Sequence, residues 1–289
     1  MNIFFVQIVL FLLIISLCVN KNTLATELIP KKDKKHKSNK FTKHKPKKNK
    51  KCYPTYDNTK EIYQKNKHLL YIDTEETIKA CKFMNDALKQ LEHHATSKGY
   101  TICGGIPSEN KVFYKKKHRG HTKILKAEYT VDDPNEYNEL LNKIWNPDSD
   151  LYLNNSAVKK KIVRVYSPNL VMIQQRCKKH PWSLRKYFYA LAAKFKISEN
   201  KAIVVMASAN IIDHNRKNKK YFENTIVESA NLFQAEVDSE DDIRNGKIKK
   251  AFVNLIGYIV EKRKDHIYII YIESMTSIQI LIIIYFNNC

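Results

Sequence analysis

The residues of this chain that could do acid–base or metal chemistry are histidines and clustered acids. They are His93-His94, His118-x-x-His121, His180 and Glu240-Asp241-Asp242. General acid–base catalysis needs a base held beside a matched partner, and a metal site needs ligands at fixed spacing. The histidines stand among lysines without matched carboxylates, the acids are typical of a solvated loop, and no GxSxG, P-loop, HExxH or CxxC pattern occurs. We therefore expect no catalytic residue, no metal and no cofactor, and predict that the chain is not an enzyme.

A second kind of chemistry, the binding of an apolar ligand, is indicated by alternating strand residues. Lys249–Ser274 predicts a β-hairpin, because two runs rich in Val, Ile and Tyr flank a polar turn at Lys262–Asp265. Successive strand side chains point to opposite faces, so one face of this hairpin and of two earlier strands would line a cavity. The predicted lining residues are Tyr187, Tyr189, Leu191, Val205, Ala207, Val253, Leu255 and Gly257. On the residues alone, an ordinary hydrophobic core is the stronger interpretation.

Three residues near this face have specific candidate roles. Gly257, a lone glycine inside a strand, would leave room for an acyl chain. Arg185 is a candidate phosphate partner, and a merely exposed arginine is an equal alternative. Trp182, beside Pro181, would be a membrane-touching lid because Trp favours the bilayer interface, with a buried loop anchor as the alternative.

The elements that must position these residues alternate between helices and strands. A helix is predicted over Glu75–Ser97 with Thr74 as N-cap, and a second from Asp133-Pro134 to Trp145. The predicted strands are Lys111–Lys116, Lys123–Val131, Lys161–Tyr166, Leu170–Cys177, Arg185–Phe195 and Ala202–Ala209, while Asn224–Val237 is ambiguous. Helix, two strands, helix and then consecutive strands indicate an α+β domain with an antiparallel sheet.

The N-terminal part of the chain has a different composition from the rest. The formal charge is +22, and residues 30–51 hold twelve Lys against one acid, Asp33. Such a segment cannot bury enough apolar surface to fold, so we expect a disordered arm, with a solvated linker preferred over binding of nucleic acid or anionic lipid. Ile3–Val19 is a nearly unbroken apolar run typical of a signal peptide or signal anchor, and secretion would let Cys81 pair with Cys103. The predicted division is 1–20 leader, 21–66 arm, 67–274 folded domain and 275–289 apolar tail.

Several local motifs, taken in order, resemble the START family of lipid-binding domains. They are Ala127–Val131 followed by Asp133-Pro134 and Leu140-Leu141…Trp145, the stretch from His180-Pro181-Trp182 to Phe188, and Val253–Val260 with its Gly-Tyr pair. A more specific resemblance is to the fam-a proteins of malaria parasites. It rests on the leader, the Lys-rich arm and the stretch Glu76-Thr77-Ile78-Lys79-Ala80-Cys81…Met84-Asn85. This resemblance implies a helix-grip fold, secretion into the parasite vacuole or export to the host cell, and binding of a phospholipid of the phosphatidylcholine class.

The chain departs from the family pattern at three places. Asn22–Glu27 lacks the Arg of the malarial export signal, and Asp150–Asn154 lacks the Arg and Trp-Asp pair that engage the headgroup. After Ser274 only a short apolar tail follows, where the family has a long closing helix.

The resemblance as a whole predicts a secreted lipid-binding and transfer protein that is monomeric, with phospholipid and a membrane surface as partners and no nucleic acid. The alternative is a secreted basic interaction or scaffold protein whose START-like domain no longer holds lipid.

Overall fold

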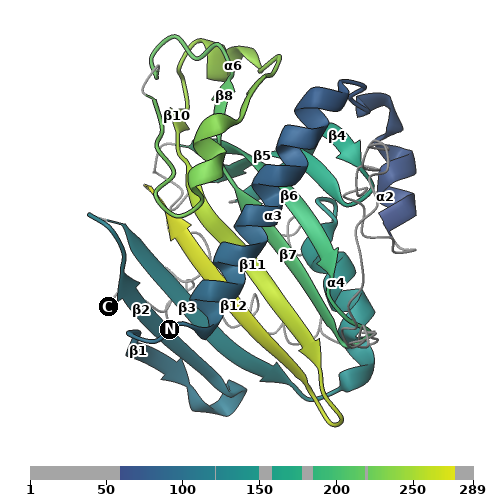
Figure 1. The fold of residues 1–289 in the computed structure, drawn as a ribbon, viewed down its shortest axis with the longest axis vertical. Helices are drawn as coiled ribbons and strands as arrows, with labels where there is room; N and C mark the ends of the chain where they lie inside the picture. The colour runs from purple at the N-terminus through teal and green to yellow at the C-terminus, as the bar shows by residue number, and fades with distance from the viewer. Residues whose placement is uncertain (1–58, 121, 150–157, 178–184, 219–220, 277–289) are drawn as a thin grey trace, which may run out of the picture.

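The computed structural model describes residues 59–120, 122–149, 158–177, 185–218 and 221–276, which are built around one large sheet (Figure 1). The strands are β1 (Thr101–Ile106), β2 (Lys111–Lys117), β3 (Lys123–Val131), β4 (Val158–Ser167), β5 (Leu170–Cys177), β6 (Lys186–Lys196), β7 (Lys201–Ala207), β8 (Asn210–Ile212), β9 (Gln234–Glu236), β10 (Lys249–Lys250), β11 (Val253–Lys262) and β12 (Ile267–Met275). The α-helices are α2 (Thr59–Lys65), α3 (Thr74–Thr96), α4 (Tyr137–Trp145) and α6 (Asp241–Arg244), and the 3-10 helices are η1 (Lys67–Leu69), η2 (Pro107–Glu109), η3 (Pro134–Glu136) and η4 (Glu228–Leu232). The predicted α+β class with a large antiparallel sheet is confirmed.

The strand order places the last hairpin in the middle of the sheet. The order is β1-β2-β3-β12-β11-β7-β6-β5-β4, and all these neighbours are antiparallel. β12 pairs with β3 through Ile267 and Val131, while β11 pairs with β7 through Gly257 and Val205. β10 adds a short parallel pairing to β6, and β8 and β9 form a separate parallel pair. The predicted hairpin is therefore confirmed, and it joins the two halves of the sheet.

Helix α3 runs diagonally across one face of the sheet, which we call the α3 face (Figure 1). Its N-cap is Asp73, not the predicted Thr74, because Asp73 Oδ1 accepts hydrogen bonds from the backbone N–H of Glu75 at 2.8 Å and of Glu76 at 3.1 Å. The acids at its first turn lie at the positive end of the helix dipole. The buried side of α3 consists of Ala80, Cys81, Phe83, Met84, Ala87, Leu91, His94 and Ala95. This stripe packs on the sheet and makes the first hydrophobic core.

The opposite face, which we call the α4 face, has a hydrophobic core of its own. Asp133 caps η3 by accepting from the backbone N–H of Asn135 at 2.7 Å, and α4 then begins at Tyr137. α4 buries Leu140, Leu141 and other apolar side chains against this face. An antiparallel sheet packed on one side only shows polar residues on the other. This sheet is apolar on both.

Residues 208–250, between β7 and β11, form a separate segment on the α3 face, which we call the 208–250 segment. It contains β8, β9, η4, α6 and β10. The stretch Asn224–Val237, which the sequence left ambiguous, is the 3-10 helix η4 followed by the short strand β9. Phe233 of this segment packs against Phe83 of α3, with ring centroids 5.9 Å apart. The segment therefore belongs to the same core as α3.

Cysteine pairing differs from the sequence prediction. Cys81 belongs to the core of the α3 face, whereas Cys103 packs against the core of the α4 face, and the two are not bonded to each other. The predicted Cys81–Cys103 bridge is therefore wrong, because the sheet separates the two residues. Among the described residues, no helix combines the length and the apolar character needed to cross a membrane.

Candidate functional site

Seven of the eight residues predicted to line a cavity lie on the α3 face, where Gly257 faces Leu91 of α3. The other six are Tyr187, Tyr189, Leu191, Val205, Ala207 and Leu255, and all are buried. The register brings them side by side, since Leu191 pairs with Ala207 and Val205 pairs with Gly257. They share one core cluster with Phe83 and Met84 of α3. The protein's own helix therefore covers the face that the sequence assigned to a ligand.

Helix and sheet come very close at Gly257. A β carbon placed on Gly257 would lie 2.6 Å from Cδ2 of Leu91 and 2.8 Å from the carbonyl oxygen of Val204. Both distances are well below the 3.5–4.0 Å or so of an ordinary carbon contact. The absent side chain therefore makes room for Leu91, where the sequence predicted room for an acyl chain.

The hydroxyl of Tyr187 belongs to a buried polar network. It donates to Asp213 Oδ2 at 2.8 Å and accepts from Asn215 Nδ2 at 2.8 Å. Lys250 Nζ forms an ion pair with the same Asp213 oxygen at 2.8 Å. Burial raises the pKa of Tyr187 above its ordinary value, so the hydroxyl stays a proton donor. This network ties β6 to the 208–250 segment.

A second polar network starts at Tyr189. The amide of Gln174 donates to the Tyr189 hydroxyl at 2.8 Å and to Glu240 Oε2 at 2.7 Å. Arg176 donates to both carboxylate oxygens of Asp242, at 2.5 Å and 3.0 Å. The acids that the sequence assigned to a solvated loop thus fasten the start of α6 to β5. Both predicted cavity tyrosines therefore have a clear role in joining the 208–250 segment to the sheet.

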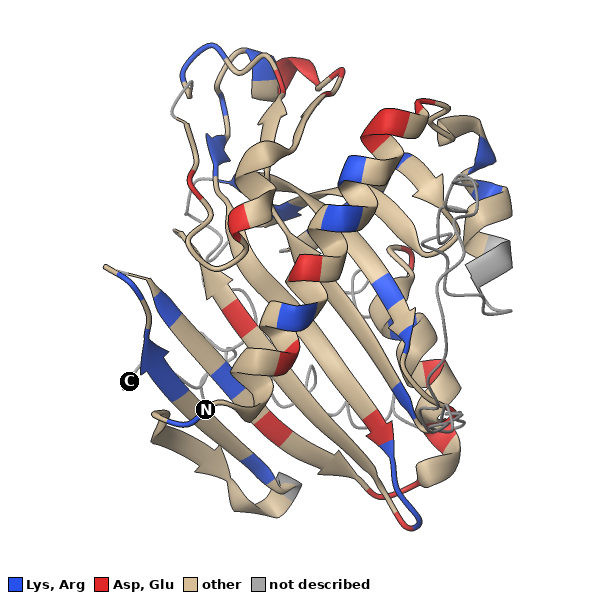
Figure 2. Cartoon of the chain, in the orientation of Figure 1, with Lys and Arg blue, Asp and Glu red and all other residues tan. Residues whose placement is uncertain are grey.

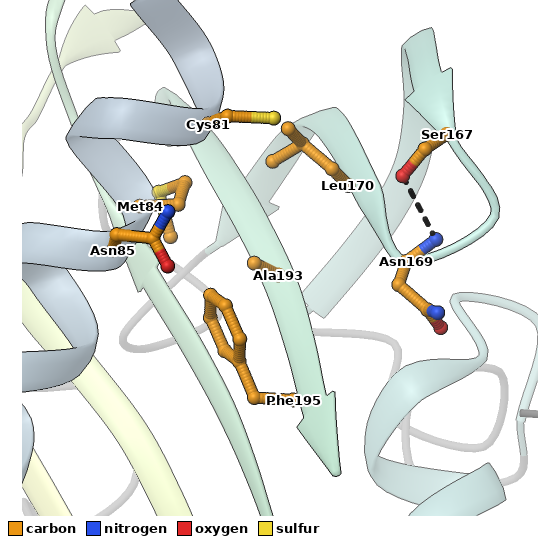
Figure 3. A pocket seen from close by; sticks show the side chains of 8 residues that line it. All are labelled: Cys81, Met84, Asn85, Ser167, Asn169, Leu170, Ala193 and Phe195. Carbon is orange, nitrogen blue, oxygen red and sulfur yellow. Dashed lines mark hydrogen bonds between the residues drawn. The ribbon is translucent and has the colours of Figure 1, made fainter. Parts of the chain in front are cut away.

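A small hollow remains on the α3 face between α3 and the strands β5 and β6 (Figure 3). Its lining residues are Cys81, Met84, Asn85, Ser167, Asn169, Leu170, Ala193 and Phe195. The hollow has about 240 Å³ of space, open solvent included. Ligand pockets usually measure about 300–1,000 Å³. It is therefore too small for a phospholipid with two acyl chains.

Val253 lies on the α4 face, so its predicted orientation is wrong. Leu255 belongs to the core of the α3 face and Val253 to that of the α4 face, although strict alternation would place them together. The register between β11 and β12 shifts between these two residues, which marks a bulge or irregularity. A bulge inserts an extra residue and breaks the alternation of side chains.

The α4 face is apolar across most of the sheet. Its buried cluster extends from Phe113 on β2 to Ile162 on β4, and β6 contributes the small side chains Ala190 and Ala192. The nine residues of α4, about 14 Å of helix, pack over β7 and β11. Nine strands at a spacing of about 4.8 Å span about 38 Å. α4 therefore lies over only part of this face, and Ile62, Tyr63 and Leu69 of α2 and η1 pack against the same cluster.

The α4 face also contains a buried lysine on β6. Lys194 alternates with Ala190 and Ala192 on β6 and is only 5% exposed. Burial lowers the pKa of Lys194 to about 8. The signal for its burial was its place directly after Phe188, Ala190 and Ala192 on the same side of β6.

The remaining two predicted site residues are Arg185, which directly precedes β6, and Trp182. Arg185 is exposed, and its carbonyl oxygen accepts from the backbone N–H of Lys249 at 3.1 Å. Its contact with a phosphate stays a prediction. Trp182 lies outside the described residues, so its role as a lid also stays a prediction.

No family model matches the sequence, and no curated protein matches it. Among solved structures, the chain is similar to human STARD10, with a TM-score of 0.47 and 9% identity over 66% of this chain and 67% of that chain. It is also similar to human StAR-related lipid transfer protein 5, with a TM-score of 0.48 and 11% identity over 69% of this chain and 83% of that chain. A StAR-related lipid transfer protein fragment from Xanthomonas axonopodis gives a TM-score of 0.40 and 10% identity over 64% of this chain and 88% of that chain. At these values the likeness concerns the fold, and we derive no ligand or site residue from it.

Proposed function

We propose that this chain is a START-like protein that binds and transfers a phospholipid, with the acyl chains against the α4 face beside α4. The observation that supports this is the width of that apolar face, which extends from Phe113 on β2 to Ile162 on β4 while α4 packs over β7 and β11. β6 is buried on both sides, with Leu191 facing α3 and Ala192 facing the other way. The motifs that resemble START domains in the sequence imply the same function.

Binding by this face needs no nucleophile and no base. Each buried methylene of an acyl chain contributes about 0.8 kcal/mol, so a shallow apolar surface suffices for affinity. β6 presents the small side chains of Ala190 and Ala192 to this face. The apolar side chains of this face are buried in the structure, so uptake requires the face to open at a membrane and to close around one lipid.

The direct test is to purify the full-length chain, extract it with organic solvent and identify bound lipid by mass spectrometry. A phospholipid at near-stoichiometric amount, of the phosphatidylcholine class or another, would support the proposal. A well-folded, lipid-free protein would instead favour the basic interaction or scaffold protein.

Two adjacent alanines offer a matched pair of variants. Ala192 faces the α4 face, and Ala193 faces the α3 face, where it lines the small hollow. Both are buried, so Ala192→Leu and Ala193→Leu each overpack a core at a cost of about 1–3 kcal/mol. We expect Ala192→Leu to reduce bound lipid and Ala193→Leu to leave it largely unchanged. Equal lipid loss in the two variants would contradict the assignment of the α4 face.

We also propose that the chain is secreted by way of its apolar leader, as the fam-a resemblance implies, to a compartment where it meets membranes as a monomer. N-terminal sequencing of the mature protein tests the first step. A retained Met1 would contradict cleavage of the leader.

A further inference from the structure

Three lysines lie at one end of the hairpin of β2 and β3, where Figure 2 shows positively charged residues on both strands. Lys117 pairs directly with Lys123 across the two strands, and Lys115 lies two residues before Lys117. Residues two apart on a strand share a face. Phe113 and Leu125, the next residues of this face on the two strands, belong to the core of the α4 face. The three ammonium groups therefore continue the α4 face toward solvent; we call them the lysine triad.

The lysine triad carries charge that the described residues around it do not balance. Residues directly opposite in an antiparallel pair have β carbons about 4.5–5.5 Å apart, and like charges there are destabilising. In the described part of the chain, no acid forms an ion pair with Lys115, Lys117 or Lys123. The facing acid on the adjacent strand is Glu273, opposite Leu125, which is 1% exposed and accepts from the Tyr271 hydroxyl at 2.8 Å. The three lysines thus lie near one carboxylate, that of Glu273, which is buried and already accepts a hydrogen bond.

An apolar track begins where the lysine triad ends. On β3 the next residues of the same face after Lys123 are Leu125, Ala127 and Tyr129, all buried in the core of the α4 face. At about 3.4 Å per residue, the distance from Lys123 to Tyr129 is about 20 Å. A cationic end followed by a long apolar surface has the complementary pattern of an anionic phospholipid.

We propose that the lysine triad is the headgroup site for an anionic phospholipid whose acyl chains lie on the α4 face; this rests on the proposed function and names its ligand class. The triad attracts phosphate and carboxylate groups and repels the positive group of a zwitterionic headgroup. The preferred lipid is therefore one with net negative charge, such as a phosphatidylserine, in place of the phosphatidylcholine that the family resemblance implies.

The test uses the full-length chain and soluble short-chain lipids below their micelle concentration. Binding of a phosphatidylserine, of the matching phosphatidylcholine and of inorganic phosphate is measured by calorimetry. The site variant is Lys117→Gln with Lys123→Gln, and the control is Lys82→Gln with Lys264→Gln, two exposed lysines elsewhere that give the same change in net charge. Removing two cations next to an anionic lipid should weaken phosphatidylserine binding at least tenfold in the site variant and leave phosphatidylcholine binding within twofold.

Each other outcome counts against the inference in a distinct way. Equal loss in the site and control variants would show that the general charge of the chain, including its Lys-rich arm, attracts the lipid. Equal binding of both lipids, unaffected by the site variant, would overturn the headgroup site and leave the proposed function standing. Inorganic phosphate that binds as tightly as the lipid and is lost in the site variant would show a site for free anions. Absence of binding for both lipids would overturn the proposed function itself.

Discussion

Substitution of Gly257 by alanine tests whether α3 is packed on the sheet as described. The added methyl group would lie 2.6 Å from Leu91 Cδ2 and 2.8 Å from the Val204 carbonyl oxygen. Carbon atoms prefer about 3.5–4.0 Å, so helix or strand must move by about 1 Å, and overpacking of this kind costs about 1–3 kcal/mol. The loss of unfolded-state entropy on replacing glycine offsets about 0.4–1 kcal/mol of that cost. We therefore expect a net destabilisation of about 1–2 kcal/mol, measured by urea unfolding.

A second glycine on the same sheet provides the control. A β carbon at Gly104 would lie 3.7 Å from Phe113 Cδ2, which is an ordinary contact. Gly104→Ala should therefore change stability by less than about 0.5 kcal/mol. Leu91→Ala should reduce the cost of Gly257→Ala by at least about 0.5 kcal/mol in a double-mutant cycle, since it removes the clashing methyl groups. A neutral Gly257→Ala would refute the packing of α3 at this point and would restore the sequence-based idea of open space beside the glycine.

Three further predictions concern groups whose surroundings the structure defines. Burial, reinforced by neighbouring cations, lowers the pKa of His94 from 6.5 to about 4. The unfolded chain therefore binds the proton at a higher pH than the folded chain, and the free energy of unfolding should fall by up to about 3 kcal/mol as the pH drops from 6.5 to 4. Urea unfolding of the wild type should show this pH dependence, and the His94→Gln variant should show less of it. Tyr187→Phe removes the hydroxyl that donates to buried Asp213 and should cost about 1–3 kcal/mol in thermal or urea unfolding, whereas an unchanged midpoint would contradict the network. Burial raises the pKa of the Cys177 thiol to about 12, so at pH 8 an alkylating reagent should label Cys177 in unfolded but not in native protein, as read by peptide mass.

Elements with strong periodicity were predicted well from the sequence. The bounds of β3 and β5 agree with the prediction residue for residue, and α3 differs from it by one residue at each end. Alternation of β-branched and aromatic residues fixes such strands locally, and a 3.6-residue stripe does the same for a helix. β1, with Gly104 and Gly105 in its six residues, was missed because glycine weakens the strand signal.

The candidate site was predicted less well, for two physical reasons. Alternation separates Leu191 from Ala192 correctly, but it does not say which of two apolar faces the helix α3 will cover. That choice depends on the path of the chain between distant elements. The second reason is the break in register between Val253 and Leu255, which moves Val253 to the other face and leaves no trace in the pattern of residue types.

β11 and β12 are the last described strands to be synthesised, yet they form the centre of the sheet. Until residues 253–275 have been made, β3 and β7 each lack one neighbour, and the two half-sheets β1–β3 and β4–β7 have no strand in common. The growing chain therefore carries two open, apolar strand edges throughout synthesis, which is the state most exposed to wrong pairing with other chains. Pairings such as Val131 with Ile267 join distant parts of the sequence, and such contacts slow folding. Assembly of the sheet thus waits for the end of translation, and a premature stop before residue 253 would leave two unjoined halves.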